Sequence, residues 1–242
     1  MHLKIGAKEM DISIVTSCYN GYDRYLPRWI DSICKGISKP RQVVVIAVEA
    51  DLRNLEYVIE KAVEHNIRYH IAETTSAKAM GVLRNKAVEA ATQEWIMYLD
   101  VDDEILPGAL VDINKYKDKA DVIVGGLLIK RKGKMSVKKF LHASNQAVLN
   151  GRHCSSSHGI YRKSFWKKAP YHEYNDWCEQ PFWIGLAYAK ARFIGIPEVC
   201  TIYNRSETGH NLSMTKEDKK RAKRQRERML KQGFIKEGDD NV

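Results

Sequence analysis

The chain has 242 residues, of which 44% are hydrophobic and 29% charged, and its formal net charge is +10. This composition suffices for one large domain or two small ones, and no apolar run is long enough to span a bilayer. Five scattered cysteines without a CxxC pair argue against a disulfide framework or a structural zinc site, and the first residues lack the pattern of a secretion signal. We therefore expect a globular, cytoplasmic protein.

Apolar strands and amphipathic helices alternate over the first half of the chain. The apolar runs predict strands at 12–15, 43–48, 67–71 and 95–99. The helical spacing predicts helices at 26–35, 52–65 and 78–92, with a further helix opening at Pro107 toward Tyr116. This order is typical of βαβ units. It predicts an α/β fold with a Rossmann-like, mostly parallel sheet and helices on both faces.

Polar clusters follow three of these strands, at Thr16–Asn20, Glu49–Asp51 and Asp100–Asp103. Ligands of open parallel sheets bind beyond the carboxyl ends of the strands, so we expect a ligand site there. The third cluster has three carboxylates in four residues, and such charges raise one another's pKa unless a cation or hydrogen-bond donors compensate. Paired carboxylates suit Mg²⁺ or Mn²⁺, and a solvated acidic turn is the alternative.

The second half of the chain is less regular. After a strand at 122–124, a polar segment at 145–158 predicts a loop, followed by an aromatic helix at 176–190 and a strand at 192–196. We expect a lid on the same sheet and no independent domain. His153 and His158 either face a substrate or bond locally. Trp177 and Trp183 belong to the core or to a crevice wall, where one of them would stack on a ligand.

Two clusters of basic residues occur, at Lys130–Lys139 and at Lys219–Lys231. Such patches attract polyanions. The partner is then an acidic polysaccharide, an anionic membrane surface or nucleic acid. A solvated, solubilising terminal helix is the alternative for the second cluster.

Three blocks of the sequence resemble the family-2 glycosyltransferases. The first block, from Ser13, reads SIVTSCYNGYDRYLPRWIDSI, and the last, from Cys178, reads CEQPFWIGLAYAKARFIGIPEVCTIYNR. The middle block is the specific one and reads AMGVLRNKAVEAATQEWIMYLDVDDEILPGAL from Ala79. It contains an Arg-Asn pair, an Ala-rich helix, a strand, Leu-Asp-x-Asp-Asp and Pro-Gly-Ala-Leu in the order of that family.

The resemblance implies a GT-A fold and transfer of a sugar from a nucleotide-sugar donor to a hydroxyl group, with inversion at the anomeric carbon. The donor expected is a UDP-sugar, and the cofactor is Mn²⁺ or Mg²⁺. The catalytic domain would span 1–214, with a nucleotide-sugar-binding half at 10–115 and an acceptor half at 116–214. A basic C-terminal helix or tail would follow at 215–242.

The resemblance also assigns roles by position. Asp102 would bind the metal, with His210 as a second ligand or else an ordinary loop histidine. Asp103 would cap the following helix, and Asn85 would lie beside the donor together with Arg84. The residues expected to bind the nucleotide sugar are Thr16, Tyr19, Asn20, Glu49, Arg84, Asp100, Val101 and Asp102.

The general base is expected at the start of the late aromatic helix. Inverting transfer needs a carboxylate opposite the leaving diphosphate to accept the proton of the attacking hydroxyl. The family has Glu-Asp at this place, where this chain has Cys178-Glu179, so Glu179 takes the role by position and Asp176 is the alternative. Either residue is also explained as a carboxylate favoured at a helix N-terminus. After its second strand the family has an Asp-Asp-Gly-Ser turn, where this chain has Val48-Glu49-Ala50-Asp51. This difference leaves open which nucleobase the donor carries.

Three other functions remain open at this point. A DNA-modifying glycosyltransferase acting on a hydroxylated base would use the basic clusters. A nucleotidyltransferase or nuclease would use Asp100 and Asp102 in a two-metal site, although the chain has neither GxGxxG nor a Walker A loop. A non-catalytic module that binds nucleotides or polyanions is the third.

Overall fold

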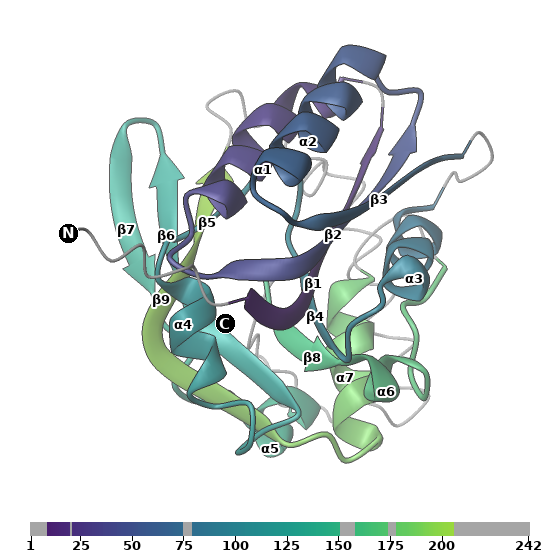
Figure 1. Cartoon of the computed structure of the whole chain (residues 1–242). Helices are drawn as coiled ribbons and strands as arrows, with labels where there is room; N and C mark the ends of the chain where they lie inside the picture. Colours follow the sequence, from purple (N-terminus) through teal and green to yellow (C-terminus); the bar gives the residue numbers. More distant parts are fainter. Residues whose placement is uncertain (1–8, 20, 75–78, 151–157, 174–177, 206–242) are drawn as a thin grey trace.

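The computed structural model describes residues 9–19, 21–74, 79–150, 158–173 and 178–205. Within these residues nine strands form one sheet in the order β3-β2-β1-β4-β8-β6-β9-β5, and β7 pairs with β6 alone (Figure 1). The strands are β1 (Glu9–Tyr19), β2 (Lys39–Val48), β3 (Arg68–Glu73), β4 (Trp95–Tyr98), β5 (Glu104–Ile105), β6 (Val122–Arg131), β7 (Lys134–Lys138), β8 (Ile160–Arg162) and β9 (Phe193–Arg205).

The predicted strand–helix alternation is confirmed over the first half of the chain. A short 3-10 helix, η1 (Asp23–Tyr25), precedes the first α-helix. The helices are α1 (Leu26–Cys34), α2 (Leu52–Glu64), α3 (Met80–Ala90), α4 (Ala109–Asn114), α5 (Asn145–Leu149), α6 (Lys163–Trp166) and α7 (Glu179–Tyr188). The boundaries of the helices predicted at 26–35, 52–65 and 78–92 differ from those observed by no more than two residues.

The sheet is mixed but mostly parallel, as predicted. β1 to β4 run parallel to one another, and β6 runs parallel to β9. The short β8 lies between β4 and β6 and is antiparallel to both, while β5 is antiparallel to β9. Because β8 and β6 extend the sheet of the first four strands, the second half of the chain continues that sheet.

Two hydrophobic layers enclose the sheet. One layer contains α1, α2 and α4, and the other contains α3, α5 and α7. In the first layer Trp29 is fully buried, and its Nε1 donates to the carbonyl oxygen of Leu99 at 3.2 Å, so α1 is fixed to the end of β4. In the second layer Trp183 packs edge-on against Tyr161 at 5.9 Å between ring centroids. Trp183 is therefore a core residue.

The basic cluster Lys130–Lys139 forms a β-hairpin, which the sequence did not predict. β6 and β7 are paired from Leu127–Lys138 to Arg131–Lys134. The two turn residues, Lys132 and Gly133, have φ of 47° and 70°, as a two-residue type I′ turn requires. Lysine is depleted in strands, so composition indicated a charged surface segment here and hid the ladder.

Two further predictions, of a loop from residue 145 and of the helix cap by Asp103, were wrong. The segment predicted as a loop at 145–158 begins with α5, whose N-cap Ser144 accepts a hydrogen bond from the N–H of Ala147 at 3.2 Å. α4 begins at Ala109 with Gly108 as its N-cap and has no side-chain cap, so Asp103 does not cap it. Asp103 instead bonds elsewhere, as described below.

Candidate active site

The three aspartates form a tight turn directly beyond β4. The N–H of Leu99 donates to the carbonyl oxygen of Val15 at 3.0 Å, which extends the pairing of β4 with β1 up to the first aspartate. The N–H of Asp103 then donates to the carbonyl oxygen of Asp100 at 3.0 Å and closes the turn. The cluster therefore lies at the carboxyl ends of the central strands, where the sequence placed it.

Arg84 joins two of the predicted site carboxylates. Its Nη2 atom donates to Oδ1 of Asp100 at 3.1 Å and lies 2.6 Å from Oε1 of Glu179. The side chains of Asp100 and Glu179 are each 29% exposed, whereas that of Arg84 is 4% exposed. One buried cation thus holds a carboxylate of the β4 turn next to a carboxylate of the first turn of α7.

Aromatic rings hold Arg84 in this position. Its Cζ atom lies 4.5 Å from the centroid of the Tyr98 ring and 5.6 Å from that of Tyr171. Burial disfavours the charged guanidinium group, but the adjacent Glu179 and the other negative groups outweigh it, so the pKa of Arg84 is raised. A permanently charged guanidinium next to two aromatic rings is suited to fix the orientation of both carboxylates.

Asp103 forms an internal ion pair. Its Oδ2 atom lies 2.7 Å from Nε2 of His158, and its Oδ1 atom accepts the N–H of Asn204 at 2.8 Å. Both side chains of the pair are almost fully buried. Burial raises the pKa of Asp103; burial opposes charge on His158, but the nearby carboxylates outweigh it and raise the imidazole pKa. Of the two alternatives for His158, a local bond and contact with an acceptor, the structure supports the local bond.

Asp102 carries a charge that its surroundings disfavour. Burial and then the charges of Asp103 and Asp100 raise the pKa of its carboxyl group to about 7. Its carbonyl oxygen accepts hydrogen bonds from Nη2 of Arg28 at 2.5 Å and from Nδ2 of Asn204 at 3.0 Å. The backbone of Asp102 is thus held from two sides, and a cation beside the carboxylate would stabilise its ionised form.

The chemistry of this cluster fits a hard divalent cation. One atom each of Asp100, Asp103 and His158 lies within 4.8 Å of the others, which is compatible with a metal site. Both oxygens of Asp103 are already bonded, however, and a cation there would have to replace His158. Asp102 and Asp100 fit better, because both are partly exposed and oxygen ligands are preferred by Mg²⁺ and Mn²⁺.

The residues predicted to contact the nucleoside differ in how exposed their side chains are. Tyr19 is half-buried at the end of β1, with its ring 4.8 Å from that of Tyr22. Glu49 is exposed beyond β2 with φ of 50°, a conformation that is uncommon outside glycine and concentrates at functional sites. Thr16 and Val101 are buried. For these two residues a donor contact stays a prediction and would involve backbone atoms.

Asp23 holds together the segments that are predicted to contact the nucleoside, and the sequence analysis did not identify it. It is buried, and its Oδ1 accepts the N–H of Gly21 at 3.0 Å. Its Oδ2 accepts the N–H of Asp51 at 3.2 Å and Nδ2 of Asn54 at 2.8 Å. The turn after β1 is thereby fixed to the start of α2. An acidic residue in a Gly-Tyr-Asp turn was the available signal.

Asn85 has a structural role, and its expected place beside the donor stays a prediction. Its Oδ1 accepts the N–H of Tyr171 at 2.9 Å and Nε1 of Trp166 at 3.0 Å, and its Nδ2 donates to the carbonyl oxygen of Tyr171 at 2.8 Å. A Cβ atom at Gly81 would lie 1.7 Å from the carbonyl oxygen of His172. The backbone at His172 therefore lies in close contact with α3. Asn85 therefore positions the ring that covers Arg84.

Several predicted residues lie outside the described part of the chain. They are Asn20, His153, Asp176, Trp177 and His210, together with the basic segment 215–242. Their roles stay predictions.

Comparison with known proteins identifies the family of the chain. The model of the family described as Glycosyl transferase family 2 matches residues 13–175, which is well over half of the chain. The chain belongs to glycosyl transferase family 2. The family match includes Arg84, Asp100 and Asp102, and it ends before Glu179.

Relatives of this family-2 glycosyltransferase support the GT-A fold. The uncharacterized glycosyltransferase MJ1057 of Methanocaldococcus jannaschii is 29% identical over 113 residues, 46% of this chain and 39% of that protein. TarS 1-349 of S. aureus, solved with UDP-GlcNAc, has a TM-score of 0.68 at 21% identity and covers 85% of this chain and 62% of its own. The mannosyltransferase PcManGT of Pyrobaculum calidifontis, solved with GDP-Man and Mn²⁺, has a TM-score of 0.56 at 15% identity. The match covers 79% of this chain and 56% of the PcManGT chain.

The chain spans less than two thirds of the length of each of these relatives. No helix among the described residues is long and apolar enough to cross a membrane.

Proposed function

We propose that this chain transfers a sugar from a nucleotide-sugar donor, a UDP-sugar in the first instance, to a hydroxyl group with inversion at the anomeric carbon. The observation that carries the proposal is the contact of Asp100 and Glu179 with one nitrogen atom of Arg84. It brings a carboxylate of the family's Asp-x-Asp segment next to a candidate base. The nucleotide sugars bound by TarS and PcManGT support the donor class.

Asp102, with Asp100 beside it, would hold the divalent cation. The bound cation would stabilise the charge that develops on the diphosphate as it leaves. Mn²⁺ in the PcManGT complex and the raised pKa of Asp102 both favour this assignment. His210 remains a candidate second ligand from outside the described residues.

Glu179 would act as the general base. It would accept the proton of the acceptor hydroxyl as that oxygen attacks the anomeric carbon from the side opposite the diphosphate. Arg84 contacts Oε1 of Glu179, so we assign the proton to Oε2. Tyr19 and Glu49 would contact the nucleoside from the carboxyl ends of β1 and β2.

The test is thermal unfolding of the full chain with a panel of nucleoside diphosphates, with and without Mn²⁺. A ligand at a hundred times its dissociation constant stabilises the native state by about 2.7 kcal/mol, which for this size corresponds to roughly 5–10 °C. We expect a Mn²⁺-dependent shift with uridine diphosphate that is lost in Asp102→Asn and kept in Asp118→Asn, a matched change of an exposed aspartate. A shift with guanosine diphosphate alone would reassign the donor. No shift with any diphosphate would favour the non-catalytic binding module.

A further inference from the structure

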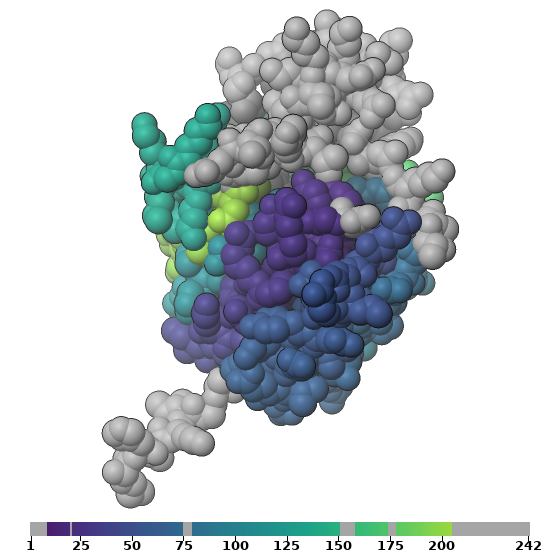
Figure 2. Space-filling view, turned by 90° about the horizontal axis from the view of Figure 1, so that it is seen from above, coloured from purple at the N-terminus to yellow at the C-terminus, as the bar shows by residue number. Residues whose placement is uncertain are grey.

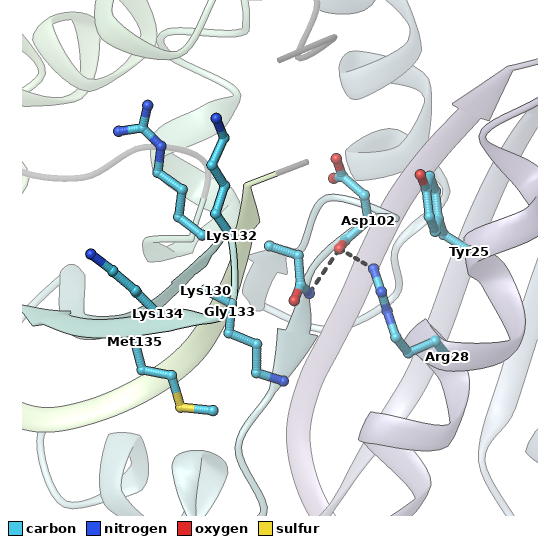
Figure 3. Close-up of a pocket in the computed structure, with 10 residues that line it drawn as sticks. Tyr25, Arg28, Asp102, Lys130, Lys132, Gly133, Lys134 and Met135 are labelled. Carbon is cyan, nitrogen blue, oxygen red and sulfur yellow. Dashed lines mark hydrogen bonds between the residues drawn. The ribbon is translucent and has the colours of Figure 1, made fainter. Parts of the chain in front are cut away.

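A basic pocket adjoins the proposed metal carboxylate. It has a volume of about 340 Å³ and lies between α1 and the β6–β7 hairpin (Figure 3). Figure 2 shows the hairpin, in teal, standing out from the body of the molecule. The residues that line the pocket are Tyr25, Arg28, Asp102, Lys130, Arg131, Lys132, Gly133, Lys134, Met135 and Asn204.

The pocket has a surplus of positive charge. Its lining includes five Lys and Arg side chains against the single carboxylate of Asp102. Glu104 lies beside it and offsets part of this charge, at 3.7 Å from Nε of Arg28 and 3.8 Å from Nζ of Lys130. For Arg131, Lys132 and Lys134 the structure gives no ion pair within its described residues. Neutral sugar hydroxyls do not require such a surplus, whereas a bound anion does.

The aspartate turn borders the pocket through Asp102. Arg28 and Asn204 both donate to the carbonyl oxygen of Asp102, from α1 and from β9. The hairpin is a paired ladder closed by a two-residue turn, so its lysines extend from a regular scaffold. The basic wall and the proposed metal carboxylate are therefore held at a fixed separation.

We propose that this pocket binds a phosphate group of the acceptor, and this inference rests on the proposed function. Three lysines and two arginines around one site suit a phosphate, which accepts many hydrogen bonds at once. Most of the pocket lining comes from β6, β7 and β9, in the half of the chain expected to bind the acceptor. Tyr19 and Glu49, the proposed nucleoside contacts, follow β1 and β2, on the other side of β4 in the strand order. We therefore assign the phosphate to the acceptor and not to the donor.

The size of the pocket favours a single phosphorylated sugar or polyol unit. Its volume is at the lower end of the range for small-molecule sites, about 300–1,000 Å³. A nucleic-acid duplex or a membrane surface would contact the outside of the hairpin without filling this pocket. These two occupants are distinguishable outcomes of the test.

The experiment measures binding of sn-glycerol 3-phosphate and of glycerol to the full chain saturated with Mn²⁺ and the nucleoside diphosphate. The two probes differ only in the phosphate group. The hairpin variant carries Lys132→Glu and Lys134→Glu, and the control carries Lys167→Glu and Lys168→Glu, exposed lysines at the end of α6. We expect binding of the phosphate probe but not of glycerol. The affinity should fall at least tenfold in the hairpin variant and change less than twofold in the control, and both variants should keep their circular dichroism spectrum.

Three results would overturn the assignment. The first is no binding of the phosphate probe up to 50 mM, and the second is equal binding in the hairpin variant. The third is a tenfold loss of nucleoside-diphosphate affinity in that variant, which would make the pocket part of the donor site. Hairpin-dependent binding to phosphatidylglycerol vesicles or to duplex DNA without binding of the phosphate probe would reassign the surface. Failure of the proposed function is distinct, because wild type would then show no diphosphate shift.

Discussion

At the residue scale, Arg84 determines how two carboxylates lie relative to each other. Asp100 and Glu179 are 79 positions apart in the chain, yet both contact Nη2 of this one buried side chain. Breaking a buried, charge-paired contact of this kind leaves uncompensated charge. The position of the candidate base is therefore linked to the position of the turn that we propose binds the donor.

Glu179→Gln tests the base directly. Glutamine preserves the size of the side chain and a carbonyl oxygen for Arg84, but it accepts no proton from the acceptor. We expect nucleoside-diphosphate binding within threefold of wild type and transfer reduced by about 10²–10⁴-fold, the usual contribution of a general base. The matched control is Glu173→Gln, an exposed glutamate outside α7, which should keep full transfer. Full transfer by Glu179→Gln would favour Asp176.

Asp102→Asn tests the electrostatic cost of the acidic turn. The folded-state pKa of Asp102, about 7, is above the unfolded value of 3.8, so the folded protein binds the extra proton. The unfavourable contribution of the carboxylate therefore grows as pH rises from 3.8 to about 7 and is complete above that range. In EDTA at pH 8 we expect the variant to melt a few degrees higher than wild type, with the difference shrinking toward pH 5. An unchanged melting temperature at both pH values would contradict this account.

At the scale of secondary-structure elements, the Asp103–His158 pair connects the turn after β4 to the start of β8. Removing one partner of a buried pair typically costs about 3–5 kcal/mol, because the other charge stays buried. We expect this loss for His158→Gln, which leaves three neighbouring carboxylates without their imidazole. The double variant Asp103→Asn with His158→Gln should recover more than 1 kcal/mol of it. Additive effects in this cycle, measured by urea unfolding, would exclude direct coupling.

Local sequence patterns predicted the helices and strands whose own residues carry a clear hydrophobic period. The apolar run before Asp100 identified β4, and its strand end identified the candidate site. The pairing of β8 between β4 and β6 was not predictable, because a three-residue strand has no period to detect. The partners of Asp103 were equally hidden, since His158 lies 55 residues away. A lysine-rich composition concealed the hairpin that carries the basic pocket.

At the scale of the whole molecule, one sheet joins residues from both halves of the chain. β8 follows β4 in the sheet, and β5 from the first half pairs with β9 near the end of the described chain. The candidate site reflects this arrangement, because Asp100 comes from the first half and Glu179 from the second. The predicted division at residue 115 separates parts of one sheet.

A fragment of residues 1–115 tests whether the first half folds alone. The cut exposes the edge of β4 that β8 covers and removes β9, the partner of β5. It also removes α7 and Tyr161, which share a core layer with Ile96 and Tyr98. Because a domain is stable by only about 5–15 kcal/mol, the loss of these contacts should leave the fragment unfolded. We therefore expect no cooperative melting of the fragment, and for the intact chain a single transition in which circular dichroism and tryptophan fluorescence coincide. A cooperative transition of the fragment would establish that the nucleotide-sugar-binding half folds independently.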